Sequence, residues 1–194
     1  MTAPALAQTL QDSKCTGRPD IPWDAQIAGC TNAIKSGRYT GKELAAAFTS
    51  RAAAHRAKRD LERAIQDYGQ AIKLNPNEAA AFYYRGIAHG MRGETGPAIQ
   101  DFSQAIKLDP KDAYSYNNRG MAFRQRKQLD KAFADFDTAL KLDPKLAIVH
   151  VNRGAVLEDK GDRAGALAAY RAALAIEANF KPALDNLAKM DAKP

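Results

Sequence analysis

Apolar side chains recur at helical spacing along most of the chain, and the pattern repeats. Ile65, Tyr68, Ile72 and Leu74 line one face of a predicted helix, and the same arrangement returns 34 residues later and 34 residues after that. The residues that continue it are Ile99, Phe102, Ile106 and Leu108, followed by Phe133, Phe136, Leu140 and Leu142. This spacing is typical of amphipathic α-helices. Alanine is abundant and β-branched residues are sparse, which also favours helix.

The chain aligns with itself without gaps over four segments of 34 residues, which are 45–78, 79–112, 113–146 and 147–180. Position 8 is always small, and its residues are Ala52, Gly86, Gly120 and Gly154. Position 24 is always aromatic, and its residues are Tyr68, Phe102, Phe136 and Tyr170. Alanine fills positions 20 and 27, and proline stands at position 32 of the first three segments. Small residues let two antiparallel helices approach closely, the aromatic fills the space between them, and proline ends the second helix. Each segment therefore predicts one helical hairpin.

These columns resemble the tetratricopeptide repeat family over four full units. The resemblance implies an all-α, right-handed superhelical solenoid of helical hairpins, with a concave groove lined mainly by the first helix of each repeat. One hairpin cannot bury its apolar face alone, so we expect neighbouring hairpins to stack. Three positions depart from the family pattern: Ala52 replaces glycine, Ala178 replaces proline, and His150 replaces an aromatic.

Both ends of the solenoid are predicted to be capped. Residues 21–44 are expected to form an N-terminal capping helix, which Pro22 opens, and a loop with four extra residues. Residues 181–194 are expected to form a C-terminal capping helix, with Pro182 at its start, and a tail. Such helices would cover the exposed apolar faces of the terminal repeats.

Residues 1–20 are interpreted as a disordered signal remnant that a disulfide staples to the chain. Ala5 and Ala7 are placed as in the last part of a secretory signal, before a cut at Gln8. An ordinary alanine-rich disordered terminus is the alternative. The even cysteine count suggests that Cys15 and Cys30 pair, as in exported proteins, while two reduced thiols are the alternative. The prediction is a periplasmic or secreted protein, with the cytoplasm as the alternative location.

By the same resemblance, several polar and aromatic residues should line the groove, at positions 2, 5, 6, 9 and 12 of the repeats. They are Arg56, Tyr83, Tyr84, Tyr114, Asn117, Asn118, Met121, Arg124, Asn152 and, in the capping helix, Asn186. Asparagine can bond a peptide backbone in both directions, and tyrosine and arginine often anchor interfaces. Simple solvent exposure is the alternative interpretation.

Arginine stands at position 7 of every repeat: Arg51, Arg85, Arg119 and Arg153. Aspartate stands at position 23 of the first three repeats: Asp67, Asp101 and Asp135. The matched columns predict an ion pair between the two helices of each hairpin, and a ladder of arginines for an acidic ligand is the alternative. Ala169 takes the place of the acid in the fourth repeat, so Arg153 is expected to be the arginine most available to a ligand.

Nothing in the sequence indicates catalysis, a metal site or a cofactor. The nucleotide-binding, metalloprotease and serine-hydrolase motifs are missing. His55, His89 and His150 fall in packing columns and are predicted to be core or half-buried residues rather than metal ligands. No apolar run reaches the eighteen residues that suggest a membrane span.

The predicted function is therefore non-enzymatic: an adaptor that binds a protein or peptide in the groove. The net charge of +7, which is largest in segments 45–78 and 113–146, favours a partner with acidic residues. One alternative is a structural module of an envelope assembly that associates with its own copies. Another is a basic surface that binds anionic ligands or nucleic acid. Nucleic acid is disfavoured because the aromatics occupy packing positions rather than alternating with basic residues.

Overall fold

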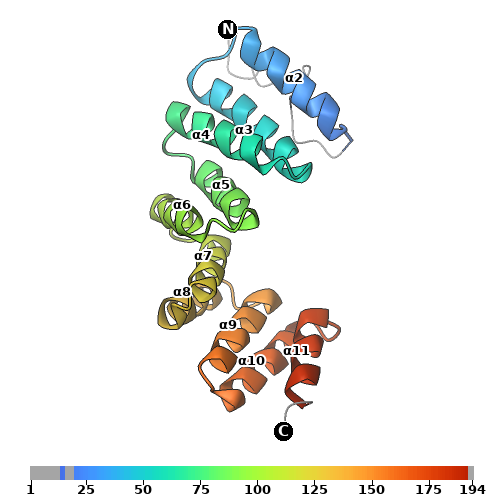
Figure 1. Ribbon diagram of the computed structural model, residues 1–194, viewed down its shortest axis with the longest axis vertical. Helices are drawn as coiled ribbons and strands as arrows, with labels where there is room; N and C mark the ends of the chain where they lie inside the picture. The colour runs from blue at the N-terminus through green and yellow to red at the C-terminus, as the bar shows by residue number, and fades with distance from the viewer. Residues whose placement is uncertain (1–13, 16–19, 192–194) are drawn as a thin grey trace. The chain divides into compact units, whose positions relative to one another are not determined.

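The computed structural model describes residues 14–15 and 20–191, which contain ten α-helices and no strand (Figure 1). The predicted signal remnant around Ala5, Ala7 and Gln8 lies outside the described residues. The chain divides into two compact units, Met1–Leu108 and Asp109–Pro194. The all-α class predicted from the sequence is confirmed for the part of the chain that is described.

The first unit holds five helices: α2 (Trp23–Lys35), α3 (Gly41–Ala57), α4 (Leu61–Leu74), α5 (Ala79–Met91) and α6 (Thr95–Leu108). Helix α3 packs against α4, and α5 against α6, as the two hairpins of the repeats. The first hairpin stacks on the second through α4 and α5, and α2 covers α3.

The second unit holds α7 (Ala113–Gln125), α8 (Leu129–Leu142), α9 (Ala147–Asp159), α10 (Arg163–Ile176) and α11 (Lys181–Asp191). Here α7 pairs with α8, and α9 with α10, while α8 and α9 join the hairpins. The last helix packs on α10 and also contacts α9. None of the helices described in either unit has the length and apolar character needed to cross a membrane.

The alanine and glycine columns form the contacts within each hairpin. Ala64, Ala98, Ala132 and Ala166 of position 20 are all fully buried. A Cβ added at Gly86 would lie 2.8 Å from the Phe102 ring, and one added at Gly120 would lie 2.8 Å from the Phe136 ring. These approaches are closer than a side chain allows, so the aromatic of the second helix requires glycine in the first helix of these hairpins.

The turn inside each hairpin uses a left-handed residue at position 15. Gly93 and Gly161 have φ values of +79° and +82°, as their glycine identity suggests. Arg59 and Lys127 occupy the same position with φ of 64° and 58°. The repeat geometry thus imposes this conformation even where the residue is not glycine.

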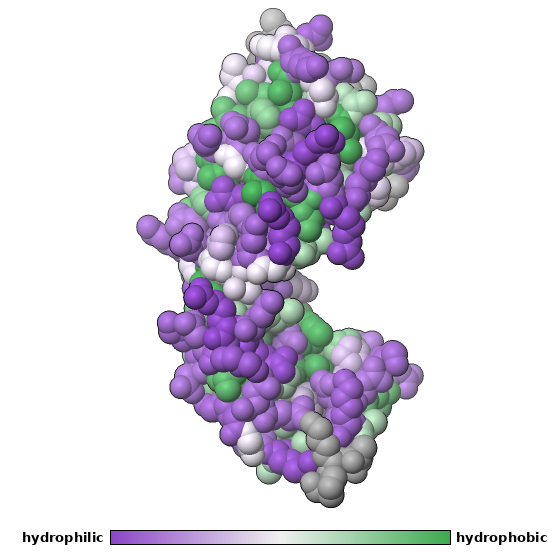
Figure 2. Space-filling model, viewed as in Figure 1, coloured by the Kyte–Doolittle hydropathy of each residue, from purple (hydrophilic) through white to green (hydrophobic). Residues whose placement is uncertain are grey.

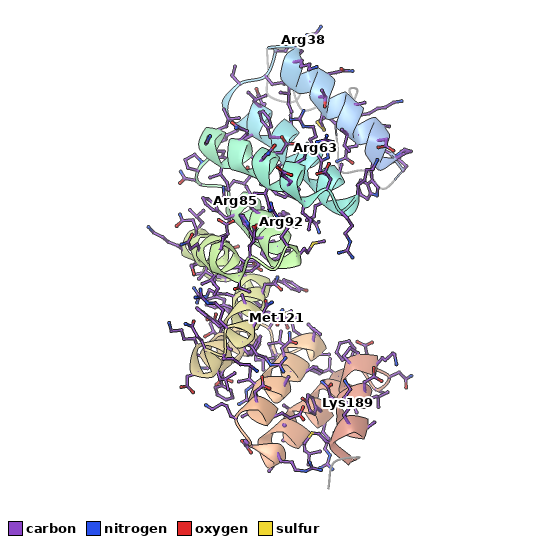
Figure 3. All side chains as sticks on the ribbon, viewed as in Figure 1. Arg38, Arg63, Arg85, Arg92, Met121 and Lys189 are labelled. Atoms are coloured by element: carbon purple, nitrogen blue, oxygen red, sulfur yellow. A yellow bond between two sulfur atoms is a disulfide. The ribbon has the colours of Figure 1, made fainter. Side chains whose placement is uncertain are left out.

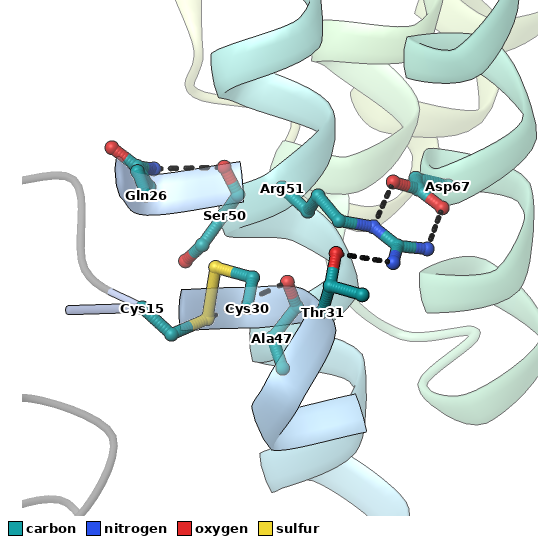
Figure 4. The surroundings of a disulfide bond; sticks show 8 residues. All are labelled: Cys15, Gln26, Cys30, Thr31, Ala47, Ser50, Arg51 and Asp67. Carbon is teal, nitrogen blue, oxygen red and sulfur yellow. Dashed lines mark hydrogen bonds and ion pairs between the residues drawn. A yellow bond between two sulfur atoms is a disulfide. The ribbon is translucent and has the colours of Figure 1, made fainter. Parts of the chain in front are cut away.

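A disulfide joins residue 15 to helix α2. Cys15 and Cys30 are joined, as predicted, and both are buried in a cluster that includes Ala47 of α3 (Figure 4). The side-chain nitrogen of Gln26 donates a hydrogen bond of 2.8 Å to the carbonyl oxygen of Ser50 (Figure 4). The bridge ties residue 15 to α2, and the Gln26 hydrogen bond ties α2 to the first repeat.

Candidate functional site

The repeated Arg–Asp pairs are structural. Arg85 donates through Nε and Nη2 to the two carboxylate oxygens of Asp101, at 2.8 and 2.7 Å. Arg51 with Asp67, and Arg119 with Asp135, repeat this two-bond geometry at 2.7–2.8 Å. The three carboxylates are buried. The predicted pairing between the helices of one hairpin is confirmed, and the alternative of a free arginine ladder is wrong for these three residues.

Arg153 was expected to lack an acid and therefore to be the arginine most available to a ligand. It does have an acidic partner, although its side chain, 29% exposed, is the most exposed of the four. Its Nε donates a 2.6 Å hydrogen bond to Asp137, and its guanidinium lies over the Phe133 ring, 4.5 Å from the centroid. Both partners belong to α8, in the preceding repeat. Asp137 thus takes the place of the aspartate that the fourth repeat lacks. It stands at position 25 of the third repeat, two positions after Asp135, so a comparison of positions 7 and 23 within one hairpin does not find it.

Five residues on the first helices of the second unit make up the main candidate site there. We call it the α7–α9 face, and its residues are Tyr114, Asn117, Met121, Ile148 and Asn152. Tyr114, Asn117 and Met121 follow one side of α7 at helical spacing. Asn152 on α9 donates a 2.8 Å hydrogen bond to the side-chain oxygen of Asn117 on α7. This amide pair holds the two helices side by side.

The apolar members of this face remain open to solvent. Tyr114 is 52% exposed, Met121 48% and Ile148 37%. Met121 is labelled on α7 in Figure 3. The hydropathy view shows a mainly polar visible surface with small separate apolar areas (Figure 2). Exposed large apolar residues on two helices that an amide hydrogen bond joins are suited to contact with another chain.

Arg124 and the remaining asparagines add less to this face than the sequence suggested. The Nε of Arg124 donates a 2.7 Å hydrogen bond to Asp159 of α9, which neutralises its charge. The side-chain oxygen of Asn118 accepts a 3.4 Å bond from Asn117. Asn186 is half-buried on α11. Arg124 thus links α7 to α9 about two helical turns further along α7 than Asn117.

The other candidates lie in the first unit and form an aromatic cluster. The Tyr83 and Tyr84 rings meet edge to face with centroids 5.1 Å apart. Tyr84 also stacks on Tyr68 at 6.2 Å, and the Arg56 guanidinium lies 5.5 Å from the Tyr84 centroid. Most of the candidate residues are therefore gathered into two clusters, one in each unit, while Asn186 and Arg153 lie outside both. Tyr68, a residue of the packing column, contributes its ring to the cluster of the first unit.

The histidines have structural partners. The Nδ1 of His89 lies 2.6 Å from Glu94, and this hydrogen bond is the main reason that the pKa of Glu94 is lowered. His55 is buried, and burial lowers its pKa although Asp67 and Asp60 act in the opposite direction. The Nε2 of His150 donates to the Pro144 carbonyl at 3.1 Å. Within residues 14–15 and 20–191, no group of acids, histidines and cysteines has an arrangement that could hold a metal ion.

Sequence models of known families match the central part of the chain. A model described as tetratricopeptide repeat matches residues 113–146, and one described as TPR repeat matches 52–93 and 91–123. A search of curated proteins gave no match.

Solved structures with the same fold are numerous, and three illustrate the likeness. MamA from Desulfovibrio magneticus RS-1 (41 to the end) is 21% identical with a TM-score of 0.78, over 92% of this chain and 97% of that chain. YrrB, described as a TPR protein with an unusual peptide-binding site, is 19% identical with a TM-score of 0.74, over 95% and 98%. The first TPR of Spaghetti (RPAP3), bound to the HSP90 peptide SRMEEVD, is 18% identical with a TM-score of 0.61, over 64% and 99%.

At these identities the similarity establishes the fold rather than the ligand. The family models, the hairpins built on the small and aromatic columns, and the related structures agree. The chain belongs to the tetratricopeptide repeat family.

Proposed function

We propose that this protein is a non-enzymatic adaptor that binds a segment of a partner protein on the first helices of its repeats. The observation that carries the proposal is the α7–α9 face, where three exposed apolar side chains stand on the two helices that the Asn152–Asn117 hydrogen bond joins. Two structures of similar fold are described as having a peptide-binding site or a bound peptide, which supports the same class of function.

The face is preorganised for this role. The Asn152–Asn117 bond and the Arg124–Asp159 ion pair join α7 to α9 at two points along the helices. A rigid surface loses little conformational entropy when it binds, so more of the contact energy is available to the complex. Tyrosine and methionine suit such a surface because one anchors and the other adapts to different partners.

A disulfide-containing adaptor fits an oxidising compartment. The Cys15–Cys30 bond supports placing the protein in the periplasm or outside the cell, because thiols are kept reduced in the cytosol. The partner in this proposal is a protein or peptide of that compartment, with acidic residues that complement the net charge of +7.

Peptide selection tests the proposal directly. A random peptide library displayed on phage is selected on the immobilised oxidised protein, and the enriched peptides are measured by calorimetry. The Tyr114→Ala/Met121→Ala variant should weaken their binding at least tenfold, because it removes two exposed anchors.

Leu142→Ala is the matched control. Leu142 is 39% exposed, but it ends α8, a second helix of a repeat. Its truncation should leave peptide affinity unchanged. Equal affinity of the selected peptides for wild type and for the double variant would rule out the α7–α9 face as the binding surface.

A further inference from the structure

The α7–α9 face carries one sulfur atom that is open to solvent. Met121 stands at position 9 of the third repeat, on α7, and it is 48% exposed (Figure 3). Position 9 holds Ala53, Ile87 and Ala155 in the other repeats, so the position is apolar throughout but carries sulfur only here. A thioether differs from those side chains because oxidants convert it into a polar sulfoxide.

The other sulfur atoms of the described chain are less open to an oxidant, with one exception. Both cysteines of the sequence form the Cys15–Cys30 disulfide, so neither is a free thiol that would react first. Met190 is 1% exposed in the core of the second unit. The exception is Met91, which ends α5 of the first unit and is 38% exposed. An oxidant in solution therefore reaches one described thioether in each unit.

Asn117 distinguishes Met121 from Met91. Its side-chain oxygen accepts the 2.8 Å hydrogen bond from Asn152, which fixes the orientation of the amide. Its Nδ2 lies 3.4 Å from the side-chain oxygen of Asn118 and 3.9 Å from the sulfur of Met121, one turn further along α7. Asn117 is 6% exposed, so water has little access to this amide. No residue of the described ranges donates a hydrogen bond to the sulfur of Met91.

We propose that Met121 is an oxidation site and that Asn117 holds the sulfoxide that forms there. A peroxide transfers one oxygen atom to the sulfur, which is oxidised by two electrons, and the other oxygen atom leaves as water. A thioether sulfur is a weak hydrogen-bond acceptor, whereas a sulfoxide oxygen is a strong one. Because the methionine side chain has three rotatable bonds, the new oxygen turns toward Nδ2 of Asn117 and accepts its hydrogen bond.

This reaction changes the chemistry of the α7–α9 face and leaves its two helices joined. The oxygen of Asn117 keeps the bond from Asn152, because the sulfoxide uses the other end of the amide. One of the three exposed apolar side chains becomes polar, so the face binds apolar groups of a partner less well. This last step rests on the proposed function. A sulfoxide reductase reverses the change with two electrons from thiols, and the oxygen again leaves as water.

Peptide mapping tests the site itself. The full disulfide-bonded chain is treated with hydrogen peroxide, and mass spectrometry follows each methionine with time. Met121 and Met91 should each gain one oxygen atom, while Met190 should stay unmodified until the chain is unfolded. A Met121 that reacts no faster than Met190 would overturn the assignment.

The hydrogen bond to the sulfoxide is measured without a partner. In ¹⁵N-labelled protein, oxidation of Met121 should move one side-chain amide proton of Asn117 to higher frequency and reduce the temperature dependence of its shift. The side-chain amide of Asn152 should keep its hydrogen-bonded shift, because its acceptor is unchanged. An Asn117 amide that does not respond to complete oxidation, or an Asn152 amide that loses its bond, contradicts the proposal.

Two leucine variants connect the oxidation to binding. Met91→Leu leaves Met121 as the one exposed thioether of the described residues, and Met121→Leu supplies an apolar side chain that peroxide does not oxidise. Peptides from the phage selection are added to each variant before treatment, and to a second sample after catalase has removed the peroxide. Oxidation should weaken binding to Met91→Leu about fivefold, because part of an apolar contact is lost. Each chain is compared with itself, and Met121→Leu should show no change on treatment.

The outcomes separate this inference from the proposed function. If the selection enriches no peptide, the proposed function fails, while the mapping and the Asn117 resonances still decide whether Met121 is oxidised and held. An equal loss of affinity in the two leucine variants would place the oxidant-sensitive residue elsewhere and overturn the inference, although the peptides would still support the proposed function.

Discussion

A Cβ added to Gly154 would lie 2.6 Å from Cε1 of Tyr170, across the hairpin of α9 and α10. The ring cannot easily retreat, because Tyr170 is fully buried and its hydroxyl donates to Glu158. We expect Gly154→Ala to lower the free energy of unfolding by about 1–2 kcal/mol, since overpacking exceeds the gain in helix propensity. Urea denaturation followed by circular dichroism measures the change.

Gly90→Ala is the control for this prediction. Gly90 lies in α5, and nothing is within 4 Å of an added Cβ. Only the propensity gain remains, so this variant should be more stable by about 0.5–1 kcal/mol. If the two substitutions changed stability in the same direction, the close approach of Gly154 to Tyr170 would not be the cause.

The buried pair of Arg85 and Asp101 should matter more than an exposed one. Asp101→Asn removes the carboxylate from a site where it is 5% exposed, and leaves the Arg85 charge without its counter-ion. Because the Arg85 side chain is 24% exposed, solvent offsets part of the loss, and we expect a cost of about 2–3 kcal/mol.

The exposed pair of Lys181 and Asp185 provides the comparison for Asp101→Asn. Their side chains are 83% and 49% exposed, so Asp185→Asn should cost less than about 0.5 kcal/mol. Equal costs in the two variants, measured in the same denaturant series, would contradict a structural role for the repeated pairs.

The hairpins could be predicted from the sequence because residues at fixed positions of a single repeat make the contacts between its two helices. The small residue at position 8 and the aromatic at position 24 determine one contact, and that contact recurs as Gly86 with Phe102 and as Gly120 with Phe136. The Arg–Asp pairs were predictable for the same reason, since position 7 always lies opposite position 23 of its own hairpin.

Contacts between repeats were harder to predict. Arg153 bonds Asp137 of the preceding repeat, and Asn152 bonds Asn117 of the preceding repeat. Stacking creates these contacts between neighbouring repeats, and a comparison of positions within one hairpin does not show them. Matched sequence positions report contacts within a hairpin, whereas the proposed binding surface depends on how the hairpins stack.

His55 should make the protein less stable in mild acid. Burial lowers its pKa below 6.5, so the unfolded chain takes up a proton at a higher pH than the folded chain does. The contribution of neutral, buried His55 to the free energy of unfolding is therefore complete above about pH 6.5 and declines as the pH falls below that value. The charged groups that act on the ring are Asp67, Asp60, Arg51 and Arg63.

A comparison of wild type with His55→Gln isolates this contribution. Denaturation at pH 7.5 and pH 5.5 gives a stability difference for each chain, and the difference should be smaller in the variant because the buried titrating group is gone. A variant with the same pH dependence as wild type would show that other groups cause the acid sensitivity.

Reduction of Cys15–Cys30 should loosen the N-terminal helix. The bridge closes a loop with a sequence separation of 15, which corresponds to about 3 kcal/mol in the chain-entropy treatment. Trp23, the single tryptophan, lies in α2 and is 45% exposed, so its fluorescence reports this helix while circular dichroism reports all helices. With a phosphine reductant, the fluorescence transition should move to lower denaturant than the circular dichroism transition.

The Cys15→Ser/Cys30→Ala variant controls for other effects of the reductant. It should match the reduced wild type and show no response to the phosphine. Because α2 also holds α3 through the Gln26 hydrogen bond to Ser50, the helix should remain folded at zero denaturant even without the bridge. Coincident fluorescence transitions in oxidised and reduced protein would mean that packing and this hydrogen bond hold α2 in place without help from the disulfide.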